Sequence, residues 1–191
     1  MTAPLRVVVG ISGASGAVIG QRVVELLAAS GRAEVHLVVS RAAERTLAHE
    51  VGPEALDRLT ALAACRHPVE NIGACIASGS FRTAGMIVAP CSIRTLSAIA
   101  SSAADNLLVR AGDVQLKERR RLVLMVRETP LHLGHLRAMV AATEIGAIIA
   151  PPVPAFYRRP ASIAAIVDHM ARRAIDLLAL DQPSLAEEWM P

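Results

Sequence analysis

The sequence predicts an α/β protein with one open, mostly parallel sheet and helices on both faces of that sheet. Short β-branched runs alternate with amphipathic stretches along the whole chain, and this alternation is typical of βαβ units. The apolar runs are nearly continuous, as expected of strands that are buried on both faces. With 191 residues, the chain has the length of a single domain.

Five runs predict strands and six stretches predict helices. The strands are expected at 5–10, 34–39, 85–89, 121–126 and 147–150. The helices are expected near 17–29, 41–49, 54–64, 93–118, 132–144 and 162–179. Residues 65–84 are expected to form an irregular loop, and the prolines of 151–160 exclude a helix interior there. We therefore expect a single domain over 1–180 and a C-terminal arm over 181–191.

Composition excludes several classes of protein. No apolar run approaches the ~20 residues needed to span a bilayer, and the N-terminus lacks the pattern of a secretory signal, so we expect a cytoplasmic protein without a membrane partner. The net charge is only +3, and aromatic residues make up 2% of the chain. Without a basic tail or aromatic residues that could stack on bases, nucleic-acid binding is not expected.

The carboxyl ends of the predicted strands carry residues that suit a phosphate group. Ligands of open parallel sheets bind beyond these ends, where the chain places GISGASG (10–16), Ser40, PCSIRT (90–95) and RETP (127–130). Glycines allow the backbone to approach a ligand closely, and the helix that follows offers free N–H groups. Ser92 is in addition a natural N-cap. A cluster of anion-binding loops is therefore expected at this edge.

Spacing restricts what the first loop can hold. The pattern G-x-x-G-x-x-G departs from the dinucleotide fingerprint G-x-G-x-x-G, and no Gly-Lys-Ser/Thr follows it. The spacing excludes a P-loop for a nucleoside triphosphate and weakens the case for a dinucleotide site. A tight turn that holds no ligand is the alternative. In RETP, Glu128 stands beside Arg127, which suits a carboxylate that carries a proton next to a guanidinium that holds phosphate. A structural ion pair is the alternative.

Two further sets of residues have less specific patterns. Arg110 and Lys117 are seven positions apart on a predicted helix and share one face, either in a ligand site or as a solvated surface. His132 and His135 are spaced i, i+3 without nearby cysteine or carboxylate partners, and the three cysteines include no CxxC pair. Neither a metal site nor a disulfide framework is therefore predicted.

In this order, the motifs resemble those of the UbiX-type flavin prenyltransferase family. The resemblance covers GISGASG, ASGSF, APCSIRTLSAIA, the block from Asp105 to Leu136 and GAIIAPPVPAFYRRP, and it runs from residue 10 to about 176. It implies a Rossmann-like (flavodoxin-like) fold and FMN as a bound substrate. A dimethylallyl group would pass from dimethylallyl phosphate to N5 and C6 of the flavin, without a metal. It also implies a dodecamer with sites at subunit interfaces, and a UbiD-type decarboxylase that receives prenylated FMN.

The resemblance also assigns roles to individual residues. The residues implied in catalysis are Ser15, Glu50 and Glu128. Those implied in holding FMN are Gly13, Ala14, Ser15, Ser40, Ser92, Ile93, Arg94, Thr95 and Arg127. Those implied in holding the prenyl phosphate and the prenyl group are Arg110, Lys117, Tyr157, Arg173 and Trp189.

Two other functions are considered beside this one. An FMN-dependent cysteine decarboxylase of the same scaffold relies on a catalytic histidine, for which His67 is the only loop candidate. A non-catalytic FMN-binding subunit of a decarboxylase would keep the first loop and PCSIRT, but it would need neither Lys117 nor Glu128.

Overall fold

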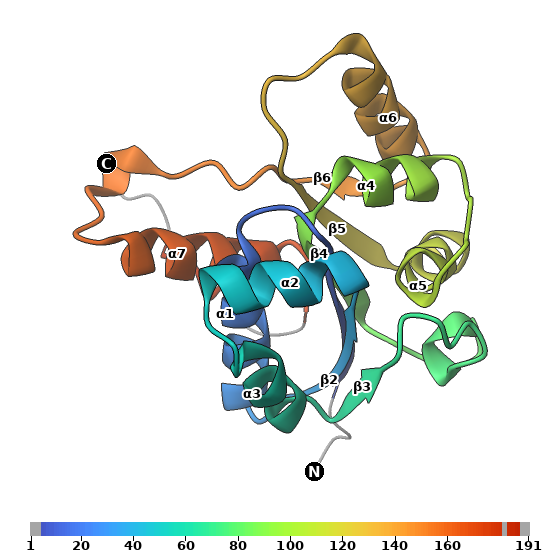
Figure 1. Ribbon diagram of the computed structural model, residues 1–191, viewed down its shortest axis with the longest axis horizontal. Coiled ribbons are helices and arrows are strands. Elements are labelled where there is room, and N and C mark those ends of the chain that lie inside the picture. The colour runs from blue at the N-terminus through green and yellow to red at the C-terminus, as the bar shows by residue number, and fades with distance from the viewer. Residues whose placement is uncertain (1–4, 181–182, 188–191) are drawn as a thin grey trace.

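The computed structural model describes residues 5–180 and 183–187 and shows a sheet between two layers of helices (Figure 1). All observed strand pairings are parallel, and the strands lie in the order β3-β2-β1-β4-β5-β6. This order is that of the doubly wound Rossmann fold, in which winding reverses between the first and fourth strands. The predicted fold class is therefore confirmed. The strands are β1 (Leu5–Ile11), β2 (Ala33–Val39), β3 (Cys65–His67), β4 (Gly85–Cys91), β5 (Arg121–Val126) and β6 (Ile148–Ile149).

The helices divide the core into two clusters, one on each face of the sheet. On β1, Val7 and Val9 pack with α1, α2, α3 and α7, whereas Val8 packs on the other face with α4, α5 and α6. Both faces of β1 are thus dry, which accounts for its continuous apolar sequence. The helices are α1 (Ala17–Ala29), α2 (Arg41–Glu50), α3 (Ala55–Leu62), α4 (Ile93–Ala100), α5 (Leu107–Lys117), α6 (Leu133–Glu144) and α7 (Ile163–Asp176), with the 3₁₀ turns η1 (Cys75–Ala77) and η2 (Phe156–Arg158). None of the helices described has the length and apolar character needed to cross a membrane.

The structure corrects the sequence prediction in two places. The single helix expected over 93–118 is two helices, because Ser102 adopts a left-handed backbone (φ 54°) and the Asn106 side chain accepts a hydrogen bond from the Val109 N–H at 3.1 Å, which starts a new helix. The irregular loop expected over 65–84 contains β3 and η1. A strand of three residues is too short to leave a period in the sequence.

Helix α1 packs against β4 at a distance that only glycine allows. A Cβ atom built on Gly20 would lie 2.1 Å from the carbonyl oxygen of Ala89 and 3.1 Å from the Ile11 side chain. The helix that follows the first loop is therefore seated directly on the centre of the sheet. This contact fixes where the first loop lies relative to the end of β4.

We expect Gly20→Ala to lower the free energy of unfolding by about 1–3 kcal/mol, since the added methyl group overpacks the α1–β4 contact and this outweighs the gain in helix propensity. Urea denaturation measures the change. Val18→Ala, at an exposed position of the same helix, serves as the control and is expected to stay within about 0.5 kcal/mol of the parent. Unchanged stability of Gly20→Ala would contradict the packing described.

Candidate functional site

Hydrogen bonds join the loops at the carboxyl edge of the sheet into one surface. The Ser40 N–H donates to the Ile11 carbonyl at 3.0 Å and links the loop after β2 to the end of β1. The Arg127 N–H donates to the Cys91 carbonyl at 3.0 Å and links the loop after β5 to the end of β4. The loops predicted to hold the ligand are thus neighbours in the folded chain.

Ser12 connects the first loop to the loop after β4. Its side chain is 1% exposed, and its hydroxyl donates to the Pro90 carbonyl at 2.9 Å while accepting the Ser92 N–H at 2.7 Å. Ser12 belongs to the loop that is expected to bind a ligand, but in the structure its hydroxyl is used inside the protein both as donor and as acceptor. Ser12 therefore positions the site and does not face a ligand.

The first loop packs tightly and leaves backbone donors available. A Cβ atom on Gly13 would lie 2.4 Å from the Cβ of Ala42 at the start of α2, so glycine is required for this approach. Gly16 adopts a left-handed backbone with φ 102°. Within the described part of the chain, the N–H groups of Gly13 and Ser15 have no partner, and Ser15 is exposed. A polar ligand can reach these groups.

Glu50 occupies the N-terminus of α1. Its carboxylate accepts the N–H groups of Gly16 and Ala17, each at 2.8 Å, and so replaces the missing side-chain cap of that helix. A carboxylate suits this place because the N-terminus of a helix carries partial positive charge. The start of α1 is therefore already occupied by an anion. A phosphate at this edge must use the starts of the other helices.

Helices α2 and α4 begin at the same edge and are each capped by a serine. Ser40 accepts an N–H of its own first turn at 3.1 Å, and Ser92 accepts the Thr95 N–H at 3.3 Å. The Ser92 hydroxyl also donates to the Thr95 hydroxyl at 3.1 Å. The first N–H groups of both helices lack partners among the residues described, which makes these starts suited to an anion.

The charged residues of the two loops after β4 and β5 are exposed and differ in their contacts. The Arg94 guanidinium reaches Asp105 in the α4–α5 loop at 2.6 Å, so the backbone of Arg94 is the part that lies at the start of α4. Glu128 accepts the N–H of Thr129 at 3.0 Å. Within the part of the chain that the structure describes, no ion pair joins Glu128 to Arg127. The two side chains at RETP are therefore available to a ligand.

Of the residues expected to hold the prenyl phosphate, Arg173 lies at the carboxyl edge. It projects from α7 and lines a cavity of about 80 Å³ with Met125, Pro151 and Val153, next to the ends of β5 and β6. Tyr157 is exposed in η2, in the segment that follows this cavity wall. Trp189 lies outside the described residues.

Arg110 and Lys117 lie in another part of the fold, on helix α5. The Arg110 side chain donates to the Ala77 carbonyl at 3.2 Å and to Asp113 at 2.7 Å, and Lys117 pairs with Glu118. Helix α5 ends at Lys117, shortly before β5 begins, so this end of α5 lies at the amino edge of the sheet. A single chain therefore does not bring Lys117 together with Arg173.

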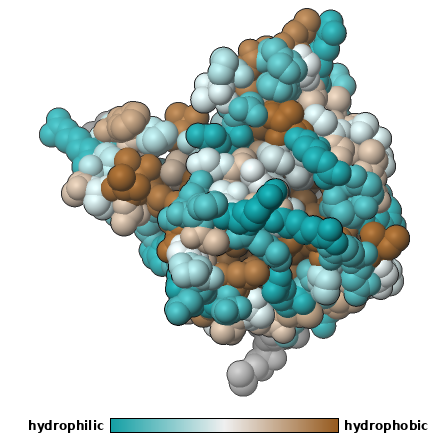
Figure 2. Space-filling model, viewed as in Figure 1, coloured by the Kyte–Doolittle hydropathy of each residue, from teal (hydrophilic) through white to brown (hydrophobic). Residues whose placement is uncertain are grey.

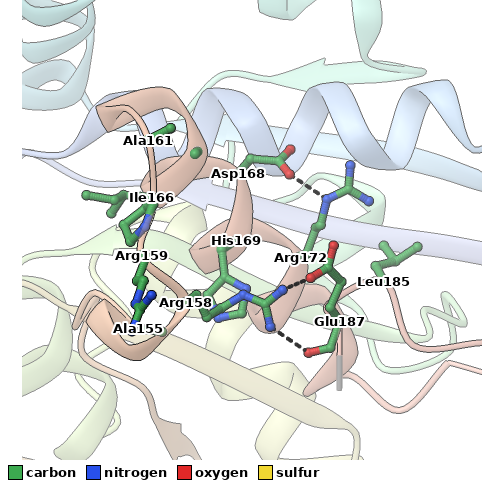
Figure 3. A pocket seen from close by; sticks show the side chains of 12 residues that line it. Ala155, Arg158, Arg159, Ala161, Ile166, Asp168, His169, Arg172, Leu185 and Glu187 are labelled. Carbon is green, nitrogen blue, oxygen red and sulfur yellow. Dashed lines mark hydrogen bonds and ion pairs between the residues drawn. The ribbon is translucent and has the colours of Figure 1, made fainter. Parts of the chain in front are cut away.

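A cavity of about 580 Å³ lies between the η2 segment and α7 (Figure 3). It shares His169 with the smaller cavity that Arg173 lines. Four of its charged groups already pair with one another: Arg158 with Glu187, and Arg172 with Asp168 at 2.6 Å. None of its lining residues belongs to the loops after β1, β4 or β5, so it borders the site without forming the edge itself.

The start of the C-terminal arm is held against α7 by Asp176, a residue that the sequence analysis missed. Its carboxylate accepts the Leu185 N–H at 2.7 Å, the Ala186 N–H at 2.9 Å and the Ser184 hydroxyl at 2.9 Å. A lone aspartate near the end of a helix gives no sequence signal for such a contact, because its partners lie in an irregular segment. Residues 184–186 of the arm are thus held against α7.

The residues that a cysteine decarboxylase or a thiol nucleophile would need are buried inside the strands that end at this edge. His67 is not in a loop but in β3, where its Nε2 lies 3.0 Å from Nδ1 of His36. Cys91 is fully buried, and burial raises the pKa of its thiol far above the usual range. Neither group is placed or charged for catalysis at the loops.

Exposed apolar side chains mark two surfaces beside the site. On α6, Leu133, Leu136 and Val140 are 58%, 45% and 57% exposed, and Phe156 and Ile163 are 71% and 79% exposed around η2 and the start of α7. Figure 2 shows hydrophobic residues at the top, where α6 projects, and at the left, near the start of α7. Patches of this kind commonly mark protein contacts.

The fold and the anion-binding edge define a nucleotide-binding α/β protein, and a family model described as Flavoprotein matches residues 1–168. Among curated proteins, the flavin prenyltransferase UbiX of Thauera aromatica is 56% identical over 177 residues, which cover 93% of this chain and 90% of the relative. The chain belongs to the UbiX-type flavin prenyltransferase family.

Solved structures agree with this assignment. A UbiX crystallised with FMN and dimethylallyl pyrophosphate superposes with a TM-score of 0.90 at 45% identity, and the match covers 98% of both chains. A dodecameric FMN-dependent UbiX-like decarboxylase from Escherichia coli O157:H7 gives a TM-score of 0.92 at 42% identity over 98% of this chain and all of that one. The family resemblance predicted from the motifs is confirmed.

We expect Ser12→Ala to lower the free energy of unfolding by about 1–3 kcal/mol, because it leaves the Ser92 N–H without its buried partner and removes one of the two hydrogen bonds to the Pro90 carbonyl. Chemical denaturation measures this loss. Ser97→Ala, an exposed serine of α4 without a side-chain hydrogen bond, is the matched control. Equal stability of the two variants would show that Ser12 does not hold the loops together.

Proposed function

We propose that this protein transfers a dimethylallyl group from dimethylallyl phosphate to reduced FMN and releases prenylated FMN and phosphate. The family membership is the observation that carries the proposal. In the reaction the C–O bond of the donor breaks, and bonds form from the prenyl group to N5 and C6 of the flavin. These bonds replace the hydrogens on N5 and C6. One hydrogen leaves as a proton, and the proton that the alkene takes up balances the loss of the other.

The residues at the carboxyl edge fit FMN. The exposed first loop offers the N–H groups of Gly13 and Ser15, and Ala14 lies between them. The starts of α2 and α4 offer further donors for phosphate and ring oxygens. The exposed guanidinium of Arg127 supplies a full positive charge. We assign FMN to Gly13, Ala14, Ser15, Ser40, Ser92, Ile93, Arg94, Thr95 and Arg127.

The prenyl-phosphate pocket is proposed to form between subunits. Arg173 and Tyr157 lie at or beside the carboxyl edge of one chain, whereas Arg110 and Lys117 are on α5 of the same chain and would serve a neighbouring site. The exposed apolar surfaces of α6 and η2 support such contacts. One relative is a dodecamer, and we propose the same assembly here, with Trp189 of the arm closing on the prenyl group.

The proposed chemistry follows from the charges of these side chains. Breaking the allylic C–O bond places negative charge on phosphate, which Arg110, Lys117 and Arg173 would stabilise without a metal. Glu128, or the departing phosphate, would accept the proton from C6. Glu50 holds the first loop and thereby places Ser15 next to the flavin. We propose a cytoplasmic enzyme whose product passes to a UbiD-type decarboxylase.

Anaerobic incubation with reduced FMN and dimethylallyl phosphate is expected to give a flavin heavier by one five-carbon prenyl unit, measured by mass spectrometry. A parallel reaction with dimethylallyl pyrophosphate decides which donor is used, since a relative was crystallised with the latter. Recovery of unmodified FMN alone from both reactions would refute the activity. FMN retained without any product would favour the non-catalytic binding subunit.

Two variants should separate catalysis from donor binding. Glu128→Gln is expected to slow transfer by about 10²–10⁴-fold while FMN stays bound, because it removes only the proton acceptor. Arg173→Ala is expected to weaken donor binding about 10–100-fold and to spare FMN, since it removes one charged contact to phosphate. Flavin fluorescence and the KM for the donor give the two readouts. Loss of FMN binding by either variant would contradict its assigned role.

A further inference from the structure

The edge of the sheet opposite β6 brings together two histidines and a cysteine that the proposed reaction does not use. His36 lies on β2, and the strand register pairs it with Cys65 on β3. Cys65 and His67 are two positions apart on a strand, so their side chains share the face on which His36 lies. The three side chains thus converge from two neighbouring strands.

The distances between their ligand atoms are close to those of a zinc site. Nδ1 of His36 and Nε2 of His67 are 3.0 Å apart, and one ligand atom from each of the three residues lies within 4.8 Å of the others. Around tetrahedral zinc, such atoms are about 3.3–3.6 Å apart, given Zn–N and Zn–S bonds of about 2.0–2.1 and 2.3 Å. Closing the set requires the Cys65 side chain to rotate and the His67 ring to turn, because Cys65 Sγ faces Nδ1 of His67 at 3.9 Å whereas His36 faces its Nε2.

Both imidazoles are shielded from solvent, since His36 and His67 are each 7% exposed. Desolvation lowers the pKa of both rings, and for His36 the neighbouring His67 lowers it further. Without a metal, the three side chains form a hydrogen-bonded chain, in which Nε2 of His67 lies 3.0 Å from Nδ1 of His36 and Nδ1 of His67 lies 3.9 Å from the Cys65 Sγ.

The side chains packed around the cluster are held by their own contacts, and their charges balance. The Phe81 ring packs edge-on against His36, with centroids 5.1 Å apart, and Arg6 stacks on Phe81 at 4.6 Å. Arg6 in turn pairs with Glu34 at 3.3 Å, so its charge is balanced next to the cluster. Cys65 is only partly buried. Its open side leaves room for water as a fourth ligand.

We propose that His36, Cys65 and His67 bind one zinc ion per chain and that this ion fastens β3 to β2. Binding forms two Zn–N bonds and one Zn–S bond, and the Cys65 thiol releases its proton to solvent, with no change of oxidation state. The strand register pairs His67 with Val38, two residues before Ser40, so the cluster lies near the carboxyl edge on its β3 side. None of its three ligands is assigned to FMN or to the prenyl donor, so the proposal does not depend on the proposed activity.

The test is a zinc titration of untagged protein that has been stripped of metal. We expect one zinc per chain by calorimetry, and a thiolate-to-metal absorption band when cobalt(II) replaces zinc. Zinc should also protect one thiol from modification. Cys65→Ala should abolish the band and weaken zinc binding about tenfold or more, and His67→Gln should weaken it similarly. Cys75→Ala removes an exposed thiol outside the cluster and is the matched control.

Three results would overturn the proposal. One is the lack of zinc binding to the parent protein at micromolar free metal. Another is zinc affinity in Cys65→Ala within about threefold of the parent, which would place the ion elsewhere, for example at the His132 and His135 pair. The third is equal loss of binding in Cys75→Ala. Because Cys65 is only partly buried, its alanine variant is expected to fold, and its circular dichroism spectrum checks this.

Discussion

The buried hydroxyl of Ser12 is the contact on which the candidate site depends. It joins the end of β1 to the end of β4 across the point where the winding of the sheet reverses. Backbone hydrogen bonds from Ser40 and Arg127 extend this connection to β2 and β5. The loops are therefore placed by hydrogen bonds between them as well as by their own strands. A ligand at this edge meets donors that are oriented before it binds, which reduces the ordering cost of binding.

The distribution of charge gives each helix start a different part in the site. Glu50 already neutralises the start of α1, so the anion-binding capacity of the edge lies at α2 and α4. The cations that would meet a second phosphate are divided between α7 at this edge and α5, whose end lies at the opposite edge. We propose that one chain holds the whole surface for one anion and, on α5 and α7, two separate parts of a surface for another.

Much of the fold and part of the site are predictable from the sequence, because they arise from local patterns. β-branched runs identify β1, β2, β4 and β5, and the rule that ligands bind at carboxyl ends selects loops that the structure joins into one surface. Contacts between distant segments leave no such pattern, and so the sequence does not reveal the bonds of Ser12, the capping of α1 by Glu50 or the attachment of the arm to Asp176. The position of Trp189 stays a prediction from the resemblance.

The two outer strands of the sheet are unusually short, with three residues in β3 and two in β6. An edge strand exposes unpaired N–H and C=O groups that can recruit a further strand, and very short edges limit such recruitment. The sheets of two copies are therefore poorly suited to pair edge to edge through their outer strands. Contacts between copies would instead use side chains on the helices, and such contacts close into a finite particle more readily than an open β-ladder.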